Sequence, residues 1–231
     1  MTDDSSPRSP SEPTPAPPPT AVGWTEAYAR MNAAFAGMEM GAYRDSAWAW
    51  VARNPHERFG VPVDRLYYAP MIELKDLLEA HGFQVWIVTA STQEYIRAVA
   101  PAGFGIAPGR VIGTWTAGEY GVEDGRSVLR RGAEQHNNGY ENKPGSIEAR
   151  LGARPVFAAG NSNNDEPMLR WSLDGQRRAF ALWIHHDDEG REYAYDRGTD
   201  RIAGLVADRP GGFEVSMKRD WDRLFGFAPE R

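Results

Sequence analysis

Short apolar runs alternate with helical patterns through most of this chain, and that alternation leaves few folds open. Residues 83–90 are almost continuously apolar, and residues 155–159 and 179–184 repeat the pattern. Strands of this type are usually buried on both faces, as in a parallel sheet covered by helices. The order of helix, strand and helix therefore predicts an α/β fold, with a three-layer parallel sheet and flanking helices. We expect the intervening helices at residues 71–81, 93–99, 144–151 and 165–171.

Two segments depart from this alternation. Residues 24–53 favour helix without a proline, and Gly37 and Gly41 mark a break between two helices. Residues 118–129, centred on Asp124-Gly125, predict a β-hairpin inserted into the core. We therefore expect three parts. They are a disordered Pro/Ser-rich tail at 1–22, a helical segment at 23–65 and an α/β core at 66–231.

The composition limits the classes of partner. The 231 residues carry a net charge of −6, which argues against nucleic acid or an anionic membrane as the main partner. The chain has no cysteine, so thiolate catalysis, disulfides and cysteine-ligated zinc are excluded. No apolar run reaches the length of a membrane span, and no signal-peptide pattern opens the chain. We expect a cytoplasmic protein; the sequence leaves its oligomeric state open.

Three polar side chains follow the predicted strands in order: Thr89, Lys143 and Asp165, the last reached through the turn Gly160-Asn161-Ser162. Ligands in parallel sheets bind at the carboxyl ends of the strands. A hydroxyl and the backbone N–H groups after it can cradle a phosphate, and a lysine adds positive charge. A carboxylate suits magnesium. Taken singly, each residue has a structural explanation, as a strand-end threonine, a surface lysine and a helix cap.

These motifs also carry a resemblance. Trp86-Ile-Val-Thr89-Ala-Ser, Asn142-Lys143-Pro144-Gly145 and Gly160-Asn-Ser-Asn-Asn-Asp165 resemble the second, third and fourth motifs of haloacid dehalogenase-like (HAD-like) hydrolases. Within that family the chain is similar to the phosphoserine-phosphatase-like branch, from Tyr67 to the C-terminus. The resemblance implies a Rossmann-like core, with residues 23–65 as a partial helical cap.

The resemblance further implies a magnesium-dependent phosphatase acting on a small phosphorylated metabolite. It makes Thr89 and Lys143 catalytic, places phosphate at Thr89, Ala90 and Lys143, and places the metal at Asp165 and Asn161. Asn161 stands where the family often carries a second acid, so we expect weak metal binding.

The family's first motif, Asp-x-Asp after an apolar strand, has no counterpart before Thr89. Asp3-Asp4 lies in the polar tail, Asp45 in a helical stretch, and Asp64 after the proline-broken Val61-Pro-Val. We therefore expect the chain to lack the first strand, the nucleophile and the front of the cap, through a start-site error, a frameshift or a deletion. Activity and stability should both be lowered.

Three functional readings remain open. In the first, the chain is an enzyme whose nucleophile lies on an extended reading frame or a separate peptide. In the second, it is an inactive remnant that binds phosphate or a partner. In the third, it is a fragment that is not stably folded. His185 and His186, followed by Asp187-Asp188-Glu189, suggest a metal site. Adjacent strand residues point to opposite sides, however, which favours a strand-end loop role instead.

Overall fold

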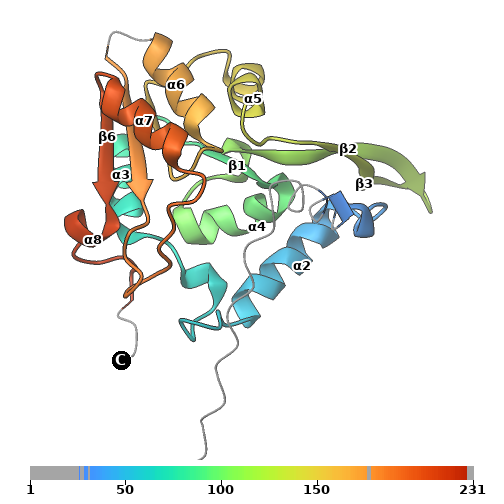
Figure 1. The fold of residues 1–231 in the computed structure, drawn as a ribbon. Coiled ribbons are helices and arrows are strands. Elements are labelled where there is room, and N and C mark those ends of the chain that lie inside the picture. Colours follow the sequence, from blue (N-terminus) through green and yellow to red (C-terminus); the bar gives the residue numbers. More distant parts are fainter. Residues whose placement is uncertain (1–25, 27–28, 31, 176–177, 228–231) are drawn as a thin grey trace, which may run out of the picture.

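The computed structural model describes residues 26–227, apart from 27–28, 31 and 176–177 (Figure 1). The tail predicted at 1–22 lies outside the described residues. The helices and strands alternate along the chain as the apolar runs predict. In order they are α2 (Met40–Arg53), α3 (Ala69–Ala80), β1 (Ile87–Thr92), α4 (Gln93–Phe104), β2 (Val111–Glu123), β3 (Arg126–His136), α5 (Asn142–Leu151), β4 (Phe157–Gly160), α6 (Glu166–Gly175), β5 (Phe180–His185), α7 (Asp200–Asp208), β6 (Gly212–Ser216) and α8 (Met217–Asp220).

The strands confirm the α/β class but lie in two sheets of three. In one, β1 pairs parallel with β2, and β2 pairs antiparallel with β3. In the other, β4, β5 and β6 are all parallel. Helices α6 and α7 pack against the second sheet, and α4 packs against β1 and β2. The single sheet expected from the sequence is thus divided between β1 and β4.

Turn residues set several element ends where the sequence predicts them. Gly152 has a φ of 63° and donates its N–H to the carbonyl of Glu148, which ends α5. Glycine adopts this left-handed conformation without the steric cost that a Cβ would bring. Asp124 and Gly125 both have positive φ, at 50° and 78°, as a two-residue hairpin turn requires. The hairpin is longer than predicted, and Figure 1 shows β2 and β3 extending away from the body of the molecule.

The predicted strand at 83–90 begins only at Ile87, because residues 83–86 have no strand pairing in the structure. Helix α7 and strand β6 were not predicted individually. The C-terminal segment packs on the core through buried Met217, Trp221, Leu224 and Phe225.

The helical segment before residue 54 docks on the base of the hairpin through a buried polar group. Arg131 is 1% exposed, donates from Nη2 to Asn32 Oδ1 at 2.9 Å, and lies 3.9 Å above the ring of Tyr43. Thr92 donates to the same Asn32 oxygen. The break predicted in this segment occurs at Gly37, which has a φ of 79°, whereas Gly41 lies inside α2.

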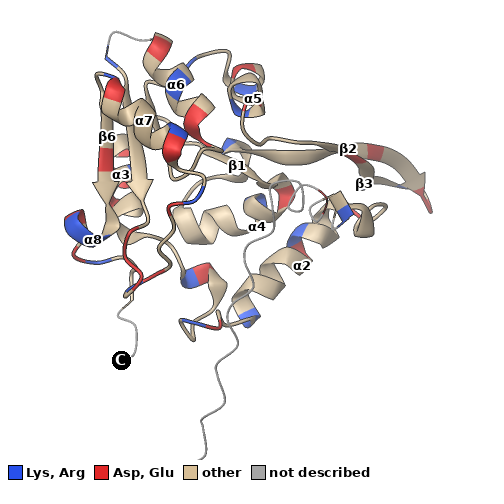
Figure 2. Ribbon diagram, in the orientation of Figure 1, with Lys and Arg blue, Asp and Glu red and all other residues tan. Residues whose placement is uncertain are grey.

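Charged residues of both signs occur on most elements in the view of Figure 2. Among the described residues, no helix is both long enough and apolar enough to cross a bilayer.

Candidate active site

The residues predicted to form the site line one cavity of about 550 Å³ between the carboxyl ends of β1 and β4. Thr89 and Ala90 come from β1, and Lys143 comes from the first turn of α5. Asn161 and Asp165 come from the loop that joins β4 to α6. The structure therefore brings together five side chains that are spread over residues 89–165 of the sequence.

Lys143 and Asp165 form a buried ion pair at the floor of this cavity. The distance from Lys143 Nζ to Asp165 Oδ1 is 2.5 Å, and the lysine is 3% exposed. The second carboxylate oxygen of Asp165 accepts backbone N–H groups from Asn161, at 2.9 Å, and Ser162, at 3.4 Å. Because a buried charge is costly without partners, these contacts compensate for the burial of both side chains.

Gly160 makes room for this arrangement. A Cβ built on Gly160 would lie 2.3 Å from the Cβ of Asp165, closer than any real contact of this kind. The turn can therefore fold the carboxylate back onto the N–H groups of its own loop only if residue 160 has no side chain.

Thr89 lies where the regular pairing of β1 ends. The parallel register with β2 holds at Val88 and shifts before Thr92, so residues 89–91 bulge from the ladder. The hydroxyl oxygen of Thr89 accepts the N–H of Ser91 at 3.0 Å. Thr92 occupies the N-cap position of α4, but its side chain makes no cap hydrogen bond and bonds Asn32 instead.

A group that the sequence did not assign to the site lies along one wall of the cavity. His186 is 6% exposed, contacts the carboxylate of Glu192 through Nδ1, and stacks on Tyr195 with ring centroids 4.6 Å apart. Its Nε2 lies 3.4 Å from the side-chain nitrogen of Asn161, which also contacts the Tyr195 hydroxyl. The His185-His186 pair was the available signal, but nothing local indicated that residues 192 and 195 fold back to it.

The electrostatics of this wall favour neutral tyrosines. Burial, and then the nearby charge of Glu192, raise the pKa of Tyr68 and of Tyr195. Both phenols therefore stay protonated at neutral pH. The Tyr68 hydroxyl hydrogen-bonds Glu192, and the Tyr195 hydroxyl contacts Asn161.

Comparison with known families supports the resemblance found in the sequence. The family model for haloacid dehalogenase-like hydrolases matches residues 13–170. The chain belongs to this family. No curated protein matches the chain.

Two solved structures resemble this HAD-like chain. A conserved protein of unknown function from Anaerococcus prevotii DSM 20548 is 15% identical, with a TM-score of 0.52 over 77% of this chain and 50% of that one. A phosphoserine phosphohydrolase-like protein from Francisella tularensis subsp. tularensis SCHU S4 is 18% identical, with a TM-score of 0.35 over 60% of this chain and 62% of that one. The first likeness supports the fold alone, and the second is too low to support an argument. The chain spans about half the length of the first structure.

The family implies magnesium, and the donors at the cavity fit such an ion only in part. Asp165 supplies the one carboxylate, and it is already paired with Lys143; Asn161 supplies an amide oxygen. The described residues contain no group of three histidine, cysteine, aspartate or glutamate side chains that could hold a metal. This donor set suits a weakly held ion that keeps most of its water ligands.

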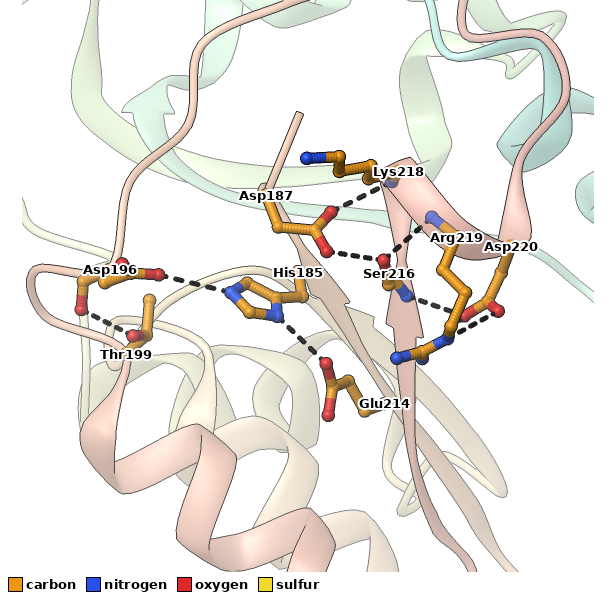
Figure 3. Close-up of polar contacts among 9 residues, drawn as sticks. All are labelled: His185, Asp187, Asp196, Thr199, Glu214, Ser216, Lys218, Arg219 and Asp220. Carbon is orange, nitrogen blue, oxygen red and sulfur yellow. Dashed lines mark hydrogen bonds and ion pairs between the residues drawn. The ribbon is translucent and has the colours of Figure 1, made fainter. Parts of the chain in front are cut away.

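The side chains of the two adjacent histidines lie in different environments. His185 lies between Glu214, at 2.9 Å from Nδ1, and Asp196, at 3.2 Å from Nε2 (Figure 3). Asp187 bonds the hydroxyl of Ser216 at 2.5 Å and the N–H of Lys218 at 2.9 Å. His185 and Asp187 thus join β5 to β6 and α8, whereas His186 faces the cavity.

Proposed function

We propose that the cavity between β1 and β4 binds the phosphoryl group of a small phosphorylated metabolite, as in a magnesium-dependent phosphomonoester phosphatase. The observation that carries this proposal is the convergence of Thr89, Lys143 and Asp165 on that cavity. The ammonium group of Lys143 has three N–H donors, and one of them bonds Asp165. The other two can donate to an anion in the cavity.

Each residue has a chemical role in this proposal. The hydroxyl of Thr89 accepts from Ser91, so its own hydrogen is available to a phosphate oxygen. Lys143 neutralises charge on the phosphoryl oxygens, and Asp165 holds the lysine in place. A magnesium ion bound by Asp165 and Asn161 would add positive charge beside those oxygens.

The chain contains no Asp-x-Asp pair before Thr89 to act as nucleophile and acid. We therefore expect turnover by this chain alone to be severely impaired, since each ~1.4 kcal/mol of lost transition-state stabilisation lowers the rate about tenfold. The second candidate function is binding without turnover. The intact Lys143–Asp165 pair favours that candidate, because anion binding does not need the nucleophile.

Titration calorimetry with inorganic phosphate, with and without magnesium, tests the binding. Lys143→Met should abolish phosphate binding, and Lys218→Met should leave it unchanged, because Lys218 is exposed and uses only its backbone N–H in the contact with Asp187. Turnover of p-nitrophenyl phosphate separates the two candidates. Phosphate binding that survives Lys143→Met in a folded variant would contradict the site.

A further inference from the structure

The side-chain amide of Asn161 is bonded at its nitrogen end. Nδ2 donates to the hydroxyl oxygen of Tyr195 and lies 3.4 Å from Nε2 of His186. Among the described residues, no hydrogen bond reaches the other end of the amide, Oδ1. Asn161 also lines the cavity between β1 and β4. Which end of the amide is available to that cavity therefore depends on the chemistry of its two partners.

A buried carboxylate decides which nitrogen of His186 carries the hydrogen. Glu192 is 4% exposed, and its Oε1 contacts Nδ1 of His186. Its Oε2 accepts the N–H of Tyr193 at 2.6 Å, and the hydroxyl of Tyr68 also bonds this carboxylate. Because the carboxylate accepts from the groups around it, the hydrogen of the neutral imidazole lies on Nδ1. Nε2 is then an acceptor.

An acceptor at Nε2 fixes the orientation of Asn161. Only the nitrogen end of an amide can donate, so Nδ2 faces His186 and Oδ1 points away from it. The reverse orientation would set Oδ1 against the lone pair of Nε2. The two orientations have the same shape, so the chemistry of the neighbours is what distinguishes them.

The ring of His186 is itself held from two sides. It stacks on Tyr195 at an interplanar angle of 26°, and it meets the ring of Tyr68 edge-on, with centroids 5.5 Å apart. The backbone N–H of Tyr195 donates to the carbonyl of His186 at 3.0 Å. These contacts restrict the turning of the ring, so the acceptor for Asn161 stays in place.

An amide needs this support more than a carboxylate does. A carboxylate presents an oxygen whichever way it turns, whereas an amide that turns over presents its NH2 group. Magnesium takes oxygen ligands, and the groups behind a metal ligand commonly set its orientation. Asn161 can therefore serve as a metal ligand in only one of its two orientations.

We propose that His186 and Tyr195 are positioning residues, which hold Asn161 with its carbonyl oxygen available to a divalent cation in the cavity. Glu192 acts through His186 by fixing its tautomer. The cation rests on the proposed function, whereas the orientation of the amide can be measured without it.

NMR spectroscopy of the full chain tests the tautomer. With isotope-labelled histidine at neutral pH, long-range proton–nitrogen correlations should show His186 protonated at Nδ1 and not at Nε2. A hydrogen on Nε2 would overturn the proposal, because Nδ2 of Asn161 would then have no acceptor there. This measurement uses the wild type, so it decides the case even if a variant does not melt cooperatively.

Titration with Mn²⁺, followed by the paramagnetic resonance signal of the free ion, tests the consequence for metal binding. Mn²⁺ stands in for Mg²⁺ because both prefer oxygen ligands. Tyr195→Phe keeps the stacked ring, loses the hydroxyl and should weaken binding about tenfold. Tyr193→Phe is the matched control and should bind as the wild type does, because the described contacts of Tyr193 use its ring and its backbone N–H. Unchanged Mn²⁺ affinity in Tyr195→Phe would overturn the positioning role.

The same change in an Asn161→Asp background separates orientation from general support of the fold. A carboxylate needs no orientation, so Tyr195→Phe should change Mn²⁺ affinity less than about twofold there. An equal loss in both backgrounds would also overturn the positioning role, because Tyr195 would then act only through the structure of the wall.

The two proposals can fail separately. A wild-type protein that binds no Mn²⁺ but has the Nδ1 hydrogen on His186 would refute the metal of the proposed function and support the orientation of Asn161. Mn²⁺ binding together with a hydrogen on Nε2 would support the metal and refute the orientation.

Discussion

Replacing Lys143 by methionine should destabilise the protein strongly, because the change leaves Asp165 buried beside an apolar side chain. Lys143 is 3% exposed and Asp165 is 8% exposed, so neither charge is well solvated. Breaking a buried pair by removing one partner typically costs about 3–5 kcal/mol. We expect the low end, about 3 kcal/mol, because two backbone N–H groups still bond Asp165.

The assay is equilibrium unfolding in urea, followed by tryptophan fluorescence. Asp165→Asn and the double variant Lys143→Met/Asp165→Asn complete a double-mutant cycle. The double variant should lose less than the sum of the two single losses, by about 1–3 kcal/mol, since it leaves no uncompensated charge. A loss below about 0.5 kcal/mol for Lys143→Met, or strict additivity, would refute the buried pair as a structural unit. Lys218→Met is the control and should change the free energy of unfolding by less than about 0.5 kcal/mol.

The remaining predictions concern neighbouring positions. Gly160→Ala should lose about 1–3 kcal/mol of stability in the same urea assay and weaken phosphate binding, because its Cβ would meet Asp165; an unchanged stability would show that the turn relaxes freely. Asn161→Asp should raise magnesium affinity at least about fivefold in calorimetry, since a second carboxylate joins the first, and a lower affinity would count against the proposed donor set. Burial lowers the pKa of His185, but hydrogen bonds to Glu214 and Asp196 outweigh it and raise that pKa above 6.5. Protonated His185 therefore stabilises the fold fully below pH 6.5, and this contribution is lost as the pH rises through the raised pKa. Urea unfolding across that window should show a fall in stability that His185→Asn removes, and an identical pH profile for the variant would contradict the assignment.

Local patterns were enough to predict the elements whose ends are encoded nearby. The hairpin turn needs positive φ at two successive residues, and Asp124-Gly125 provides them. Gly152 ends α5 for the same steric reason. The convergence of Thr89 and Asp165 was also predictable, because strands in parallel pairs present their carboxyl ends at one edge. Lys143 follows the antiparallel strand β3, so this argument does not place it.

Patterns were less informative where an element depends on distant partners. Residues 83–86 are as apolar as those after them, yet they pair with no strand in the structure. Residues 192 and 195 carry no local sign that they fold back against His186. Their place follows from the loop after β5, whose course is set by packing against other parts of the chain.

The sequence by itself determined the α/β alternation, the turns and the residue types available for binding an anion, since these depend on side-chain periodicity and backbone sterics over a few residues. Only the tertiary structure decided that Lys143 is buried against Asp165, that Arg131 anchors the helical segment through Asn32, and that a gap separates β1 from β4. Burial and strand pairing are sums over contacts between distant segments, and no single stretch of sequence records them.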